Sequence, residues 1–154
     1  MKFKIAPMTQ AEAVAIAHWR YPDPYSFYDW AADPDDAALL LDSKRRKGRF
    51  FSARDEQGDL VGFFEFQKKR KDVVIGLGLH PGQTGRGLGR EFMETGMAFA
   101  RKRFKPERFR LSVATFNTRA IKVYERAGFN TTRAFDHETN GGVYRFIEMT
   151  RPAT

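Results

Sequence analysis

Cysteine is absent from all 154 residues of this sequence. Disulfide bonds and thiolate chemistry are therefore excluded. No apolar run approaches the roughly 20 residues that a membrane-spanning helix requires, and the first residues lack the extended apolar core of a signal peptide. We therefore expect no membrane partner, and we place the protein in the cytoplasm.

Metal-binding patterns are missing as well. The three histidines, His18, His80 and His137, show none of the spacings that metal ligands need, so we expect no metal site. The sequence has an excess of positive charge, because 27 lysine and arginine residues and 19 aspartate and glutamate residues give a net charge of +8. Such an excess is typical of proteins that bind phosphates, nucleic acids included. The basic residues are spread along the chain, and aromatic residues are not interleaved with them in a stacking pattern. This favours a solvated surface plus one anionic cofactor and makes nucleic acid the weaker alternative.

The length and the composition, 42% hydrophobic and 30% charged, indicate one domain over residues 1–154. Residue patterns predict strands at 3–5, 49–54, 60–67, 73–79, 109–114, 129–135 and 143–149, and helices at 11–19, 34–47, 87–104 and 117–128. The helix at 87–104 joins two strands by a crossover, so we expect these strands to be parallel at the centre of an otherwise antiparallel sheet. The predicted fold class is α/β. The sequence leaves open whether the protein forms a homodimer.

The most informative segment is the glycine-rich loop that follows the strand at 73–79. Glycines at 82, 85, 87 and 89 let a ligand approach the backbone closely. The helix that follows directs free N–H groups and the positive end of its dipole toward the loop, and Arg86 and Arg90 add positive charge. The loop therefore predicts a site for a phosphate or pyrophosphate group. The alternative is an ordinary strand-to-helix turn that is rich in glycine.

The loop differs from the common nucleotide-binding motifs. It lacks the Gly-Lys-Ser/Thr ending of a P-loop, and its glycines do not follow the G-x-G-x-x-G spacing of dinucleotide-binding folds. Instead, the stretch resembles the pyrophosphate loop of the GNAT superfamily of acetyltransferases, Gln/Arg-x-x-Gly-x-Gly/Ala. Gly87 and Gly89 fall on its two small positions, whereas Thr84 stands where the family has Gln or Arg.

A second segment resembles the other GNAT signature, Asn-x-x-Ala-x-x-x-Tyr-x-x-x-Gly-Phe. Asn117, Ala120, Tyr124, Gly128 and Phe129 match it without a break, after one predicted helix and one predicted strand. On both motifs together, the chain is identified as a member of this superfamily. The resemblance implies a mostly antiparallel sheet of about seven strands, with a central splayed parallel pair and about four flanking helices.

The resemblance also implies acetyl-CoA as the acetyl donor and a set of residues that bind it. These are Leu77, Gly78 and Leu79 at the strand end, Thr84, Gly85, Arg86, Gly87, Leu88, Gly89 and Arg90 in the loop, and Asn117, Ala120 and Tyr124 on the next helix. In the family, backbone N–H groups at the strand end polarise the thioester oxygen, and the phenol at the position of Tyr124 protonates the leaving thiolate. The alternative for Tyr124 is a packed aromatic residue whose hydroxyl forms a hydrogen bond with a backbone group.

The general base is less sharply indicated. Glu65 shares a strand face with Val61 and Phe63, and a carboxylate among apolar residues suggests a functional reason for its place. A structural carboxylate paired with lysine or arginine is the equal alternative. His80, and water that relays the proton to bulk solvent, stay open as other routes.

The acceptor site is expected in the segment 19–30, where six of twelve residues are aromatic. These rings either pack the first helices onto the sheet or line a pocket, and Tyr21, Tyr25 and Tyr28 are our candidates for substrate binding. Aromatic faces beside Asp23 or Asp29 would suit a cationic amine. We therefore expect an N-acetyltransferase in which a primary amine attacks the thioester directly, with a small-molecule amine first and a protein N-terminus or lysine second. A non-catalytic acetyl-CoA sensor and, less favoured, a nucleic-acid-binding protein are the alternatives.

Overall fold

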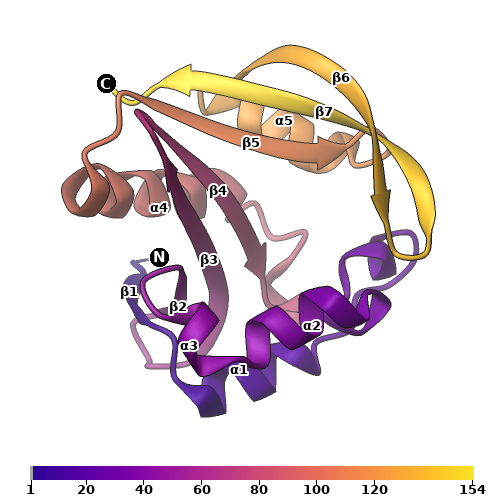
Figure 1. Ribbon diagram of the computed structural model, residues 1–154. Coiled ribbons are helices and arrows are strands. Elements are labelled where there is room, and N and C mark those ends of the chain that lie inside the picture. The colour runs from indigo at the N-terminus through magenta and orange to yellow at the C-terminus, as the bar shows by residue number, and fades with distance from the viewer. Residues whose placement is uncertain (1) are drawn as a thin grey trace.

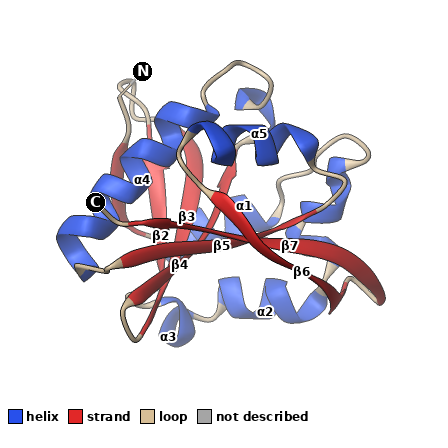
Figure 2. Cartoon of the chain, turned by 90° about the horizontal axis from the view of Figure 1, so that it is seen from above, coloured by secondary structure: helices blue, strands red, loops and turns tan. Residues whose placement is uncertain are grey.

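A computed structural model describes residues 2–154 and shows a mixed sheet with helices on both faces (Figures 1 and 2). Its strands are β1 (Lys4–Pro7), β2 (Phe50–Arg54), β3 (Leu60–Lys69), β4 (Asp72–Leu79), β5 (Arg108–Ala114), β6 (Asn130–Thr139) and β7 (Gly142–Pro152). The helices are α1 (Gln10–Ala17), α2 (Pro34–Leu41), α3 (Ser43–Arg46), α4 (Gly89–Phe104) and α5 (Thr118–Arg126). Short 3₁₀ turns occupy Tyr25–Tyr28, Trp30–Ala32 and Pro81–Gln83. Within the described residues no helix is long and apolar enough to cross a membrane.

The seven strands lie in the order β1-β2-β3-β4-β5-β7-β6. All neighbouring pairs are antiparallel except β4 and β5, which α4 connects as a parallel pair, as the crossover predicts. This pair is short, because Asp72–Val74 are the residues of β4 in register with β5, although β4 continues to Leu79. Beyond that point the two strands separate (Figure 1). The predicted seven-stranded mixed fold with a splayed central pair is confirmed.

Two apolar clusters hold the helices on opposite faces of the sheet. On one face α4 places Phe92, Met93 and Met97 against a cluster that includes Phe64. On the other face α1 and α2 pack a second cluster around Phe63. Consecutive residues of β3 thus reach opposite layers, which is the side-chain alternation that a strand imposes. Figure 2 shows α4 and α5 on one side of the sheet and α2 and α3 on the other.

Helix α1 starts at a capping box around Thr9. Thr9 accepts a hydrogen bond from the Glu12 backbone, and the Glu12 carboxylate accepts one from the Thr9 backbone, which makes a capping box. The single helix predicted over residues 34–47 is wrong. Asp42 breaks it with an extended backbone, because its side chain accepts hydrogen bonds from the backbone of Lys44 and Arg45 and so starts α3.

The last hairpin is longer than the predicted strands at 129–135 and 143–149. Strands β6 and β7 contain 10 and 11 residues and meet at a tight turn through Asn140 and Gly141. Both turn residues have positive φ, 51° and 75°, which asparagine and glycine tolerate best. The hairpin therefore extends far enough to bend toward α2 across the open side of the sheet (Figure 1).

Candidate active site

A cleft of about 860 Å³ opens where β4 and β5 separate. Its lining comes from the middle of β3, the C-terminal parts of β4 and β5, the loop before α4 and the length of α5. The aromatic segment after α1, the start of α2 and residues of β6 and β7 complete it. Segments from both halves of the sequence thus meet at one place. The splayed strands create this space, because the sheet has no strand between them at that level.

The exposed edge of β4 presents backbone groups to the cleft. The N–H of His80 donates to Val61 on β3, and successive residues of a strand direct their N–H groups to opposite edges. The N–H groups of Leu77 and Leu79 therefore face the opening beside β5. The carbonyl of Leu79 faces the same way and accepts a hydrogen bond of 2.7 Å from the Tyr21 hydroxyl. This edge is a row of polar groups that lines the cleft.

The glycines of β4 have a packing reason in addition to backbone access. At Gly78 the ring of Phe63 from β3 occupies the space that a Cβ would need. At Gly76 a Cβ would lie 3.2 Å from Oε1 of Glu65. Larger residues would push the Phe63 and Glu65 side chains away from the β4 edge.

The loop before α4 is open to a ligand along its backbone. Thr84, Gly85, Gly87, Leu88 and Gly89 all line the cleft. Gly85 and Gly87 have φ values of 74° and 75°, and no atom lies within 4 Å of a Cβ placed on either. The hydroxyl of Thr84 donates to the Pro81 carbonyl, so it stabilises the turn itself.

The cations at this end of the cleft come from α5. Arg119, Lys122 and Arg126 line the cleft, at the spacing of one helix face, and the sequence reasoning did not select them. Arg86 and Arg90 do not line it. Arg86 donates to the Gln83 side chain at 2.9 Å, and Arg90 lies 4.0 Å from Glu94. The missed signal was the i, i+3, i+7 pattern of basic residues inside the second motif.

Tyr124 lies on α5 and faces the cleft beside Asn117 and Ala120. Burial raises the pKa of the Tyr124 phenol, so the hydroxyl stays protonated at neutral pH. Within residues 2–154 this hydroxyl has no hydrogen-bond partner, which leaves it available to a ligand. The ring itself packs against Phe129. Asn117 accepts from the Ala120 backbone and starts the helix, as its sequence predicts.

All three candidate tyrosines of the aromatic segment line the cleft. Tyr21 bonds to Leu79, and Tyr25 lies under the guanidinium of Arg119, 4.2 Å from its ring centroid. Burial raises the pKa of Tyr28, and hydrogen bonds with Asn117 and Ala114 oppose that rise. Trp19, in contrast, is a buried core residue. The segment therefore serves both purposes that its composition allowed, a core contact and a pocket wall.

Three carboxylates, those of Asp29, Asp36 and Glu65, line the cleft. Glu65 forms an ion pair with Arg49 at 2.5 Å and accepts from Gln67. Its other oxygen lies above Gly76, next to the cleft edge of β4. Asp36, in the first turn of α2, also lines the cleft. Burial and then the charges of Asp33 and Glu65 raise the pKa of Asp36.

His80, the other candidate base, lies outside the lining of the cleft. Its Nδ1 accepts a hydrogen bond from the Gly82 backbone at 2.9 Å, and its ring packs edge-on against Trp19. Among residues 2–154, no group of three or more His, Cys, Asp or Glu side chains is arranged to hold a metal ion.

The tip of the β6–β7 hairpin closes the acidic end of the cleft. Asp33 accepts hydrogen bonds from the backbone of Asn140 and the hydroxyl of Thr139. The Asn140 side chain donates to the Phe27 carbonyl at 2.6 Å. We name these three contacts the hairpin clasp. The clasp joins the two halves of the molecule that the splayed strands separate.

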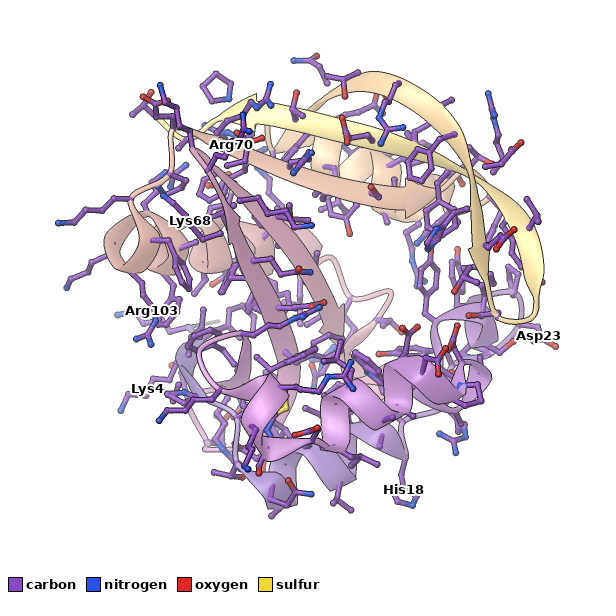
Figure 3. All side chains as sticks on the ribbon, viewed as in Figure 1. Lys4, His18, Asp23, Lys68, Arg70 and Arg103 are labelled. Atoms are coloured by element: carbon purple, nitrogen blue, oxygen red, sulfur yellow. The ribbon has the colours of Figure 1, made fainter. Side chains whose placement is uncertain are left out.

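Much of the net positive charge lies away from the cleft. Lys4, Lys68, Arg70 and Arg103 lie along one side of the molecule, and Lys4 and Arg70 point outward there (Figure 3). The Lys68 ammonium donates to the Phe104 carbonyl, and the Arg103 guanidinium lies over the Phe51 ring. None of the four lines the cleft. Within the cleft the lysine and arginine side chains are those of α5, so the charge that matters for a ligand is local.

A mixed sheet that splits between two parallel strands, with a glycine-rich helix start at the opening, is the architecture of GNAT acetyltransferases. The model of the Acetyltransferase (GNAT) family matches residues 13–129, which is more than half of the chain. This chain therefore belongs to the GNAT family.

Curated proteins named mycothiol acetyltransferase are similar in sequence. The protein from Streptomyces avermitilis is 36% identical over 132 residues, which cover 83% of this chain and 38% of that protein. The protein from Propionibacterium freudenreichii subsp. shermanii is 38% identical over 84 residues, 51% of this chain and 26% of that protein. This chain thus spans well under half the length of these relatives.

Solved structures share the fold at low identity. Spermidine N-acetyltransferase from Vibrio cholerae, in complex with CoA and spermine, gives a TM-score of 0.80 at 19% identity over 98% of this chain and 95% of that chain. A GNAT-family acetyltransferase from Bacillus anthracis gives 0.77 at 15% identity, over 99% of this chain and 96% of that one. At these identities the likeness shows the fold alone.

Proposed function

We propose that this chain acts as one cytoplasmic N-acetyltransferase domain that transfers the acetyl group of acetyl-CoA to a primary amine. The observation that carries the proposal is the cleft edge of β4. Its free N–H groups at Leu77 and Leu79 lie between a cationic phosphate-binding end and a carboxylate-lined end of the same cleft. A sensor would need the first end alone.

The residues at the cationic end fit a coenzyme A pyrophosphate. The open backbone of Gly85 and Gly87 and the helix start at Gly89 supply N–H donors. Arg119, Lys122 and Arg126 supply positive charge from the facing helix. Arg86 and Arg90 stay predicted contributors at the rim of the loop. The thioester supplies the acetyl group and a thiolate leaving group.

The chain's own groups would act at two atoms of the reaction. The N–H groups of Leu77 and Leu79 stabilise negative charge as it builds on the thioester carbonyl oxygen. The Tyr124 hydroxyl donates to the leaving sulfur. Because burial raises the pKa of Tyr124, it is a weak acid, and its contribution is expected at the low end of general-acid effects.

An ammonium acceptor must lose a proton before it attacks. Glu65 Oε1, above Gly76, is the carboxylate oxygen beside the reactive edge of β4, and we assign it the role of base. Arg49 holds the other oxygen and fixes the side chain in place. The placement of His80 against Trp19 supports Glu65 over His80.

A small-molecule amine is the acceptor that the cleft favours. The hairpin clasp closes one end, so that a peptide or protein tail has less room to pass through. Both sets of similar proteins bear the names of acetyltransferases that carry a small molecule in the name, mycothiol in one set and spermidine in the other. A protein N-terminus or lysine remains the second candidate.

The proposal is tested by steady-state release of coenzyme A with a panel of amines and peptides. The chain has no cysteine, so a thiol reagent reports coenzyme A alone. Amine-dependent release with an acetylated amine as product supports the proposal. Tight binding of acetyl-CoA without transfer to any acceptor would favour the sensor.

A further inference from the structure

The two ends of the cleft carry opposite charge. Arg119, Lys122 and Arg126 line the cleft from α5, whose Val123 lies against Gly89 of the glycine-rich loop. The carboxylates and the histidine that line the cleft are Asp29, Asp36, Glu65 and His137, and all four lie outside α5. Among residues 2–154, no lysine or arginine outside α5 lines the cleft. The coenzyme A phosphates account for the first end. A single amine, which reacts as a neutral nucleophile, does not explain the negative charge at the second end.

The acidic residues differ in whether other groups of the protein already bind their carboxylates through hydrogen bonds or ion pairs. Asp29 accepts a hydrogen bond from the Tyr21 backbone at 2.9 Å. Glu65 is neutralised by Arg49. The Asp36 carboxylate has neither a hydrogen bond nor an ion pair within the described chain, although it faces the cleft.

The surroundings of Asp36 oppose its charge. Asp33 and Asp35 lie beside it on the same helix start, Glu65 faces it from β3, and His137 faces it from β6. Partial burial and the negative neighbours raise the pKa of Asp36, and His137 opposes the rise. Like charges so close together are costly without a cation between them. A positively charged ligand group at this place would remove that cost.

The walls next to Asp36 suit an ammonium group on an apolar chain. Trp30 and Phe63 line the same end of the cleft and pack 5.5 Å apart. Aromatic faces of this kind attract cations and bury methylene groups. Glu65 stands in register with Gly76, one residue before the reactive edge of β4, and Asp36 lies within electrostatic range of Glu65.

We propose that the acceptor carries a second cationic group, beside the amine that is acetylated, and that Asp36 binds it. Asp36 then determines specificity for a diammonium substrate. Glu65 takes the proton from the reacting nitrogen, while Asp36 holds the nitrogen that keeps its charge. This inference rests on the proposed function and names its substrate class.

The test compares butane-1,4-diamine with 4-aminobutan-1-ol, which has the same length but no second charge. With saturating acetyl-CoA, the wild-type protein should show a kcat/KM for the diamine at least about tenfold higher. Asp36→Asn should lower kcat/KM for the diamine by about tenfold, mainly through KM, and lower it much less for the amino alcohol. Asp35→Asn is the matched control, because Asp35 is one residue away and does not line this cleft.

Each other result has a distinct meaning. Equal kcat/KM for the two amines in the wild-type protein overturns the inference and leaves the proposed function standing. An equal loss for both amines in Asp36→Asn assigns Asp36 to the reaction itself and also overturns it. If the wild-type protein binds acetyl-CoA by calorimetry but acetylates neither these amines nor any other, the proposed function fails together with the inference.

Discussion

Burial keeps the Tyr124 phenol protonated, and its hydroxyl faces the cleft without a protein partner in residues 2–154. Tyr124→Phe removes that hydroxyl and keeps the ring packed against Phe129. We expect kcat to fall by about 100-fold, the low end of general-acid contributions. The affinity for acetyl-CoA should change little. Steady-state kinetics and calorimetry measure the two quantities, and an unchanged kcat would reduce Tyr124 to a packing residue.

The charged Asp36 carboxylate should lower the stability of the folded protein at neutral pH. An acid whose pKa is raised on folding stabilises the folded state only while it is protonated, so its contribution is lost as pH rises through that pKa. At neutral pH we expect Asp36→Asn to melt about 1–2 °C above Asp35→Asn, a small change for a domain of this size. Both variants lose one helix-start charge and the repulsion between Asp35 and Asp36, so the comparison reports the burial of Asp36 and its repulsion by Asp33 and Glu65.

The difference between these two variants should shrink as the pH falls toward the range in which carboxylates protonate. Thermal unfolding across pH measures it. If Asp36→Asn is no more stable than Asp35→Asn at neutral pH, the repulsion inferred at Asp36 is absent.

Residues with a fixed family position were predictable from sequence, whereas residues that meet only in space were not. Asn117 and Tyr124 stand in an unbroken motif, and the structure places both at the cleft. Asp36 is distant in sequence from every motif residue and resembles an ordinary helix-start acid. Its position depends on α2, which packs on the far side of β3 from α4. No local pattern reports such a contact.

At the scale of elements, the loop before α4 depends on Gly87. Its φ of 75° is strained for any β-branched residue, and open space surrounds its Cβ position. Gly87→Val should weaken acetyl-CoA binding by at least about tenfold, because it disturbs the N–H groups that face the phosphates. The folded core should stay intact, as circular dichroism would show. Unchanged affinity by calorimetry would make this loop purely structural.

Gly89 is a less suitable position for the same test. Its Cβ would lie 3.1 Å from Val123 on α5, so Gly89→Val strains the contact between α4 and α5 as well as the loop. We therefore expect Gly89→Val to lower the melting temperature more than Gly87→Val does. Sequence alone treats the two glycines alike, because the contact with α5 is formed only in the folded chain.

The hairpin clasp should position the acidic end of the cleft. Asn140→Gly keeps the positive φ of the turn and the backbone bond to Asp33. It removes the side-chain donor to Phe27 and, with it, the acceptor of the Thr139 hydroxyl. We expect KM for the amine to rise severalfold, with KM for acetyl-CoA unchanged, since the clasp lies away from the phosphate end. Gly141→Ala, which strains the same turn but removes no contact in the clasp, is a control for turn stability.

If Asn140→Gly raises both Michaelis constants equally, the clasp acts on the whole fold and not on the acceptor end. The length of β6 and β7 decides whether the hairpin reaches Asp33 at all. Sequence patterns placed these strands but ended them early, because residues 136–139 are polar and the strand there is held by pairing with β7 and not by a buried face.

At the scale of the whole molecule, the fold was predictable because two motifs fixed the order of strand, loop, helix and strand around the splayed pair. The distribution of charge was not. The net charge of +8 suggested a general attraction for coenzyme A, yet the outward lysines and arginines lie on another side, and α5 supplies the cations at the cleft. The tertiary structure decides which of the charged side chains reach the cleft, and no sequence pattern reports that placement.

Binding of acetyl-CoA should stabilise the whole domain. A ligand at 100 times its dissociation constant stabilises the folded state by about 2.7 kcal/mol, which corresponds to a rise in melting temperature of about 5–10 °C for a domain of this length. The rise should occur without added metal. A rise seen only with a magnesium nucleotide would contradict the assignment of the cationic end to coenzyme A.

The most direct test of the central claim is the release of coenzyme A measured with and without an amine, followed by mass spectrometry of the amine. Because the chain contains no cysteine, the thiol signal comes from coenzyme A alone. We predict release that depends on the amine, saturates with its concentration and yields the mono-acetylated amine in equal amount. Release at the same rate without any acceptor, or acetyl-CoA binding with no release from any amine or peptide, would contradict an N-acetyltransferase.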